Sequence, residues 1–171
     1  MYQIGDIILY GDTGVCRIQN IISRKSPNGK DKDFYQIQPL YQQCAIYSPV
    51  DNTKVFMRPV ISKEEADKLI DEIPSMETKE YHKGPVKDKV GRYEAALKTH
   101  NCSDLIDMTM SMYAKRENLR EQKKKFGTVD ERFMKRAEDL LFGEFSVALG
   151  IPKDQVPEYI AERVGKIKER V

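Results

Sequence analysis

The chain has little of what catalysis and cofactor binding usually need. Its 171 residues include no tryptophan, two histidines and three cysteines. Cys16, Cys44 and Cys102 are odd in number, far apart and without a CxxC pattern, which argues against a disulfide framework or a zinc site and favours a reducing cytosol. His82 and His100 stand in no triad-like context. We therefore expect no enzymatic activity, no metal and no cofactor.

Long apolar runs are also absent. Uninterrupted apolar stretches cover only a few residues, as at Ile7 to Leu9, so we expect no membrane span. The first residues lack the basic start and apolar core of a signal peptide. With 40% hydrophobic and 33% charged residues, the composition is typical of a globular protein. The length suits one domain or two small ones.

The first sixty residues carry short β patterns separated by turn residues. A strand, a Gly-Asp-Thr-Gly turn at residues 11–14 and a second strand form a hairpin, because glycine tolerates positive φ and aspartate favours turns. Three further strands are predicted at residues 34–38, 44–49 and 54–58. Five short strands predict a small SH3- or Tudor-like barrel over residues 1–60. Its strand edges can accept a strand from another chain.

From residue 61 the pattern is helical, so the fold class is α+β with a C-terminal all-α domain. Ser62 and Glu65 predict a capping box for a short helix that ends before Pro74. Residues 61–85 are interpreted as this helix and a linker, and residues 86–171 as the helical domain. Ser103 is predicted to cap a helix that runs through residue 125. Residues 128–131 are predicted to form a second capping box.

An apolar stripe marks the first long helix of this domain. Val86, Val90, Tyr93 and Leu97 recur at helical spacing, and we place the basic residues 87, 89 and 92 off that stripe.

Basic charge gathers in the middle of the helical half. Residues 79–136 contain 15 basic and 9 acidic residues, a net charge of +6, whereas the whole chain carries +2. This excess is compatible with phosphate contacts, although an ordinary solvated helix surface explains it equally well. Two functional hypotheses are therefore open: protein binding by the barrel and nucleic-acid binding by the helical half.

Two sets of motifs resemble a known family. Gly5-Asp6 and Tyr10, then Gly14 and Ile18, with a proline closing the fourth predicted strand, resemble the barrel of the CarD/CdnL family of bacterial RNA polymerase-binding regulators. The same barrel is similar to the polymerase-interaction domain of transcription-repair coupling factor. In the helical half, residues 92–97, 113–116, 135–137 and 140–144 match and favour CarD. The resemblance covers nearly the whole chain.

The resemblance implies that the barrel adds a strand to the lobe of the polymerase β subunit, so that main-chain hydrogen bonds supply affinity. Many relatives have a basic residue at the position of Tyr47, so a strand pairing is implied there rather than a salt bridge. The polymerase-binding residues expected on this chain are Arg24, Lys25, Ile46, Tyr47 and Ser48.

The resemblance also implies that the helical domain lies on promoter DNA at the upstream edge of the transcription bubble and stabilises the open complex. Relatives wedge a tryptophan into the minor groove at the position of Lys89, and lysine can neutralise a phosphate but cannot stack between bases. We therefore expect the bubble to be held differently or less strongly. The expected DNA-binding residues are Lys87, Lys89, Arg92, Lys115, Arg116, Arg120, Lys123 and Lys124.

These expectations combine into a non-enzymatic transcription regulator that works as a monomer. Its partners would be the polymerase β lobe and promoter DNA, and it would lie in the cytoplasm, associated with the nucleoid through polymerase. The alternative is a protein-binding module that docks on polymerase or another partner without touching DNA. Steeply salt-dependent DNA binding separates the two hypotheses, because phosphate contacts release counterions.

Overall fold

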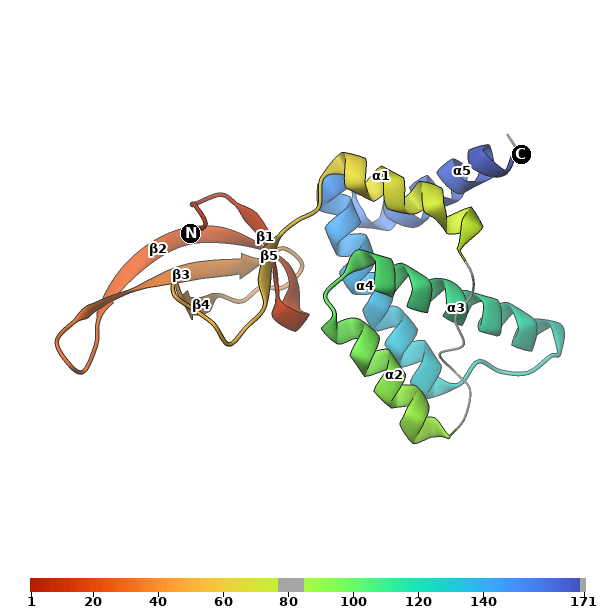
Figure 1. Cartoon of the computed structure of the whole chain (residues 1–171), viewed down its shortest axis with the longest axis horizontal. Coiled ribbons are helices and arrows are strands. Elements are labelled where there is room, and N and C mark those ends of the chain that lie inside the picture. The colour runs from red at the N-terminus through yellow and green to blue at the C-terminus, as the bar shows by residue number, and fades with distance from the viewer. Residues whose placement is uncertain (77–84, 170–171) are drawn as a thin grey trace. The chain divides into compact units, whose positions relative to one another are not determined.

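The computed structural model describes residues 1–76 and 85–169. The chain divides into two compact units, Met1–Val60 and Ile61–Val171, with strands in the first and helices in the second (Figure 1). The predicted α+β class, a small Tudor-like barrel followed by helices, is confirmed. The greater part of the predicted linker at residues 75–85 lies outside the described residues.

The first unit is a five-stranded antiparallel sheet in the order β4-β3-β2-β1-β5. Alternate side chains of its strands bury a core made of Ile8, Cys16, Ile18, Tyr35 and Ile37, as the period of two requires. An irregularity between Ile18 and Asn20 shifts the register of β2 on β3. The strands are β1 (Ile7–Tyr10), β2 (Gly14–Lys25), β3 (Asp31–Pro39), β4 (Ile46–Pro49) and β5 (Met57–Pro59).

The predicted turn between the first two strands is a short 3-10 helix, η1 (Gly11–Thr13). Gly11 has a φ of +45°, and a Cβ at this position would lie 2.9 Å from Cγ1 of Val55. Glycine is therefore required here both by the backbone conformation and by the close approach of the segment that precedes β5.

The second unit contains five α-helices and two short 3-10 helices within the described residues. Helix α1 packs on α4 and α5, while α2 packs on α3 and α4. Apolar side chains from all five α-helices form the core, where the rings of Tyr93 and Phe133 lie 5.2 Å apart between centroids. The elements are α1 (Lys63–Glu72), η2 (Ile73–Ser75), α2 (Val86–Lys98), α3 (Cys102–Glu121), α4 (Thr128–Leu149), η3 (Lys153–Gln155) and α5 (Val156–Glu169).

One predicted helix cap is confirmed and two are wrong. The Glu65 amide donates to Oγ of Ser62 at 3.1 Å, as predicted. The cap of α3 is Asn101 rather than Ser103: its side chain accepts the amide of Ser103 at 2.8 Å. Helix α4 has Gly127 as its N-cap and no side-chain cap: it begins one residue earlier than the predicted box requires, so the Glu131 amide donates to the Gly127 carbonyl at 2.9 Å instead of to the Thr128 side chain.

Helix α3 also ends earlier than predicted, at Glu121 rather than residue 125. Lys123 has a φ of +57°. The amide of Lys123 donates to the carbonyl of Arg120, and that of Lys124 donates to the carbonyl of Leu119. This bonding pattern is a Schellman motif, in which a left-handed residue terminates the helix. Lysine occupies the place that glycine usually takes.

A buried carboxylate ties the start of the helical unit to α4. Glu144 is 2% exposed, and its two carboxylate oxygens accept the amide of Ile61 and the thiol of Cys102, each at 3.1 Å. These bonds satisfy polar oxygens that would otherwise be costly to bury. Within residues 1–76 and 85–169, no helix combines the length and the apolar character needed to cross a membrane.

Candidate partner and nucleic-acid interfaces

Strand β4 offers main-chain groups at one edge of the sheet. In the part of the chain that the structure describes, β4 pairs with β3 alone. The Val50 amide donates to the Asp33 carbonyl at 3.0 Å, and the register sets Ser48 opposite Tyr35. Because hydrogen-bonded and non-hydrogen-bonded pairs alternate in an antiparallel ladder, the N–H and C=O of Tyr47 are directed away from β3. An added strand can bind there.

The side chain of Arg24 joins two strands beside this edge. Its guanidinium carbon lies 4.8 Å from the centroid of the Tyr47 ring and 5.9 Å from that of Phe34. The Lys32 ammonium nitrogen lies 6.0 Å from the Phe34 centroid. The structure thus brings two predicted polymerase-binding residues, Arg24 and Tyr47, together on one sheet face, and Lys25 is exposed next to them.

Two other predicted polymerase-binding residues face the core. Ser48 is 2% exposed, and Ile46 packs against the buried cluster of the β unit. Their side chains alternate with Tyr47, as the period of a strand requires. Their main-chain N–H and C=O groups are directed at β3, because both residues stand at hydrogen-bonded positions of the ladder. Neither residue therefore offers a main-chain hydrogen-bonding group to an added strand.

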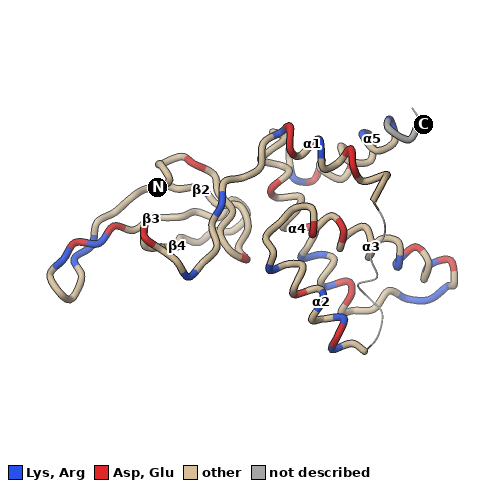
Figure 2. The backbone as a smooth tube through the Cα atoms, viewed as in Figure 1, with Lys and Arg blue, Asp and Glu red and all other residues tan. Residues whose placement is uncertain are grey.

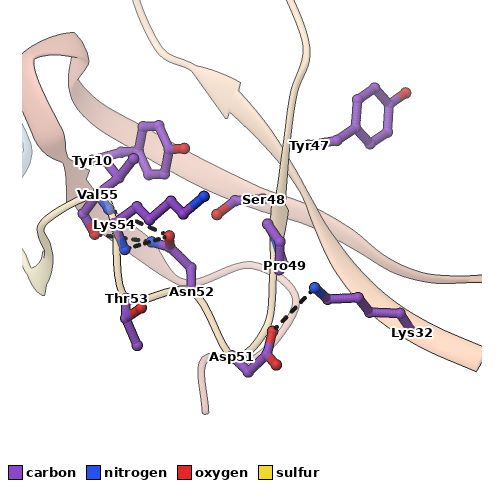
Figure 3. A pocket seen from close by; sticks show the side chains of 10 residues that line it. All are labelled: Tyr10, Lys32, Tyr47, Ser48, Pro49, Asp51, Asn52, Thr53, Lys54 and Val55. Carbon is purple, nitrogen blue, oxygen red and sulfur yellow. Dashed lines mark hydrogen bonds and ion pairs between the residues drawn. The ribbon is translucent and has the colours of Figure 1, made fainter. Parts of the chain in front are cut away.

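A cavity of about 500 Å³ follows the same edge (Figure 3). Its walls come from β4 and from the loop at residues 51–55, and Tyr10 and Lys32 complete them. The Asn52 side chain fixes the loop by donating to the Val55 carbonyl at 2.9 Å and accepting the Lys54 amide at 3.0 Å. The Lys32 ammonium lies 4.0 Å from the Asp51 carboxylate. The cavity therefore lies between β4 and this loop.

The predicted DNA-binding residues of the second unit fall into two groups. The first group lies at or near the surface of α2, α3 and the connection that follows α3. Lys87 is exposed in the first turn of α2, and Lys123 and Lys124 are exposed in the connection between α3 and α4, which Figure 2 shows as a continuous basic stretch. Arg120 pairs with Glu117 at 3.4 Å, and the Arg116 guanidinium carbon lies 5.1 Å from the Tyr113 ring centroid.

Lys89 and Lys115 form the second group and turn inward. The Lys89 ammonium lies 3.2 Å from Oδ1 and 3.3 Å from Oδ2 of Asp130, and the Lys115 ammonium lies 2.8 Å from Oδ2. Their side chains are only 14% and 20% exposed. The placement of Lys89 off the apolar stripe is wrong, because it lies one turn before buried Tyr93 on the same helix face. Val86, predicted on that stripe, is 58% exposed because it begins the helix.

Asp130 is the centre of this group, and the sequence prediction missed its role. Its side chain is 3% exposed, and Oδ1 also accepts the Tyr93 hydroxyl at 2.7 Å. Burial alone would raise the pKa of this carboxyl, but hydrogen bonds from Lys115, Tyr93 and Lys89 outweigh burial and lower its pKa. Burial and the bond to Asp130 raise the pKa of Tyr93. Asp130 also lies in the first turn of α4, where a negative charge is stabilised.

No arrangement in the described chain suggests metal chemistry. Among the described side chains, no group of three or more His, Cys, Asp or Glu residues is placed to hold a metal ion. The chemical groups that stand out are instead the strand edge of the β unit and the basic side chains of the helical unit.

Comparison with known proteins agrees with the geometry of the β unit. The family model of the CarD-like/TRCF RID domain matches residues 2–61, which is the whole of the sheet. No curated protein matches the chain. The domain connects the protein with transcription and with RNA polymerase. The N-terminal unit of this chain belongs to the CarD-like/TRCF RID domain family, and over these residues the resemblance to the CarD-like RNA polymerase-interacting proteins is confirmed.

Proposed function

We propose that the protein is a non-enzymatic transcription regulator that binds the lobe of the RNA polymerase β subunit through β4. It binds promoter DNA near the upstream bubble edge through its helical unit and so changes the stability of the open complex. The observation that carries the proposal is the outward-directed main chain of Tyr47 within a CarD-like/TRCF RID domain. Such an edge binds a partner by adding a strand to the sheet.

The polymerase contact depends on the main chain more than on side chains. Tyr47→Pro removes the outward N–H, and a proline is tolerated on an edge strand when its nitrogen faces away from the sheet. Tyr47→Ala removes the same side chain, including its contact with Arg24, but keeps the N–H. The difference between the two variants isolates the main-chain hydrogen bond.

The experiment measures binding of the full chain to the isolated β lobe by calorimetry. We expect Tyr47→Pro to bind about tenfold more weakly than Tyr47→Ala, because a lost interfacial hydrogen bond costs about 1–2 kcal/mol. Equal affinities for the two variants, with both sheets intact by circular dichroism, would contradict strand addition at β4.

The basic residues at the surface of the helical unit support the DNA contact. Four of these residues are exposed and two, Arg92 and Arg116, are half-buried, and none of the hydrogen bonds of Asp130 comes from them. The exposed ones are Lys87 on α2, Arg120 on α3, and Lys123 and Lys124 just after α3. Phosphate binding by such residues releases counterions, so affinity falls steeply with salt.

The test is a salt titration of the full chain on a forked promoter duplex without polymerase. We expect Lys124→Met to lower the slope of log affinity against log salt by about 0.9, the value for one phosphate contact. Lys30→Met, which removes an exposed charge of the β unit, is the control and should leave the slope unchanged. A wild-type chain with no salt-dependent binding would favour the rival function, a protein-binding module without DNA contact.

The effect on transcription is measured separately. We expect the full chain to lengthen or shorten the lifetime of the open complex at a promoter that polymerase melts slowly, and Tyr47→Pro to abolish that effect. If the chain bound polymerase without changing the lifetime of the open complex, the proposed docking on polymerase would stand and the proposed regulation of the open complex would be contradicted.

A further inference from the structure

Three helices of the second unit meet at one carboxylate. Lys89 and Tyr93 come from α2, Lys115 comes from α3, and Asp130 comes from α4. We call these four residues the Asp130 cluster. Its polar contacts are 2.7 to 3.3 Å long, and the carboxylate side chain is 3% exposed. The cluster is thus a closed set of charge-assisted hydrogen bonds at a helix junction.

The two lysines of the cluster are not free to follow a phosphate. An ammonium that left Asp130 would take a bond away from a buried carboxylate, and a buried charge that loses its partner is strongly destabilised. Their side chains are also only 14% and 20% exposed, so moving outward would require them to leave their packing. Both lysine side chains therefore bind Asp130 inside the helical unit instead of extending into solvent.

The same helix carries a lysine with the opposite orientation. Lys87, two residues before Lys89, is exposed. Residues two apart on a helix do not share a face. While Lys89 and Tyr93 attach α2 to Asp130, Lys87 remains in solvent. Lys115 and Lys124 form a similar contrast, since Lys115 binds Asp130 and Lys124 is exposed after the end of α3.

We infer that Asp130 is a positioning residue that selects which basic side chains of the helical unit reach DNA. It holds Lys89 and Lys115 inward as ties for α2 and α3, and so leaves the DNA contact to the basic residues at the surface. The inference rests on the proposed function. It separates Lys89 and Lys115, which act inward, from the exposed Lys87, Lys123 and Lys124, which act outward.

Two matched pairs of variants test this division in the full chain on forked duplex DNA. We expect Lys87→Met and Lys124→Met each to lower the salt slope by about 0.9, and Lys89→Met and Lys115→Met to leave it unchanged. All titrations are run where circular dichroism shows the variant folded. A loss of slope in Lys89→Met equal to that in Lys87→Met would overturn the inference.

A second measurement needs no DNA, and its main comparison is made within the wild-type chain. Reductive methylation of the wild-type chain, followed by mass spectrometry, gives the rate at which each lysine reacts. We expect Lys89 and Lys115 to react about tenfold more slowly than Lys87 and Lys124, because reaction requires local release from Asp130. Asp130→Asn should remove much of this protection while Lys87 and Lys124 react as before.

The two measurements fail in different ways. Equal methylation rates for the four lysines would overturn the role of Asp130 and leave the proposed function standing. A wild-type chain with no salt-dependent DNA binding would overturn the proposed function, and with it the part of the inference that concerns DNA.

Discussion

The two units offer a partner different kinds of group. The β unit offers main-chain atoms of β4, whose direction follows from the alternation of the strand whatever side chain stands at position 47. The helical unit offers side-chain charges, and each charge is available only if no internal partner holds it. A strand edge can therefore be recognised from a sequence pattern, whereas a basic surface requires a three-dimensional inventory of ion pairs.

The largest expected effect comes from the centre of the helical unit. Asp130→Asn leaves two largely buried lysines without their carboxylate, so we expect a loss of about 3 kcal/mol in the free energy of unfolding, near the low end for a broken buried pair because both lysines keep some solvent. The matched control on the same helix is Asp139→Asn, whose exposed pairing with Lys153 at 3.5 Å should contribute about 0–1 kcal/mol. Urea denaturation measures both. Equal losses would remove the contrast between internal and surface charges.

Acid should reduce the same stabilisation. The pKa of Asp130 is lowered by folding, so its contribution is present above its unfolded pKa of about 3.9 and is lost as pH falls through its folded pKa. We therefore expect the stability difference between wild type and Asp130→Asn to be full at pH 7 and to shrink as pH falls below about 4. Urea denaturation at a series of pH values measures it. A difference that is constant down to pH 2 would show that the carboxylate charge does not carry the effect.

Lys89→Trp sharpens the comparison with relatives that wedge a tryptophan at this position. Lys89 lies against Asp130 and is 14% exposed. A tryptophan there removes an ion pair and adds volume to a packed junction, so we expect a loss of about 2 kcal/mol in unfolding free energy rather than a new contact with DNA. Thermal unfolding and open-complex lifetime, measured together, check this. A stable variant with a longer open-complex lifetime would show that position 89 can point outward.

Much of the fold could be predicted from the sequence because its signals are local. The five strands, the Ser62 cap and the start of α2 follow from alternation, turn residues and capping chemistry, and the structure agrees. The polymerase-binding and DNA-binding residues stay predictions. Local patterns could not reveal the contacts of Asp130. Residues 128–131 have the pattern of a capping box, but the Asp130 carboxylate within it binds two lysines that are distant in sequence. Tyr93 one turn after Lys89 was the available signal that Lys89 faces inward.

The end of α3 was missed for a different reason. A run of lysines favours a helix, and only the backbone shows that Lys123 adopts a left-handed conformation with a φ of +57°. A non-glycine residue in that conformation costs about 1–2 kcal/mol. In β4 every residue keeps the regular alternation of a strand. The direction of its main-chain groups could therefore be predicted from the sequence, whereas the end of α3 could not.

The smallest expected effect tests that last point. Lys123→Gly removes the strain of a left-handed lysine at the end of α3, so we expect a gain of about 1 kcal/mol in unfolding free energy, partly offset by the greater freedom of glycine in the unfolded chain. Because the variant also removes an exposed charge, its salt slope on forked DNA should fall by about 0.9. Lys124→Gly is the control: it removes the neighbouring charge without relieving a positive φ, so it should lower the slope without a gain in stability. If both variants changed stability alike, the Schellman geometry of Lys123 would not be what limits the helix end.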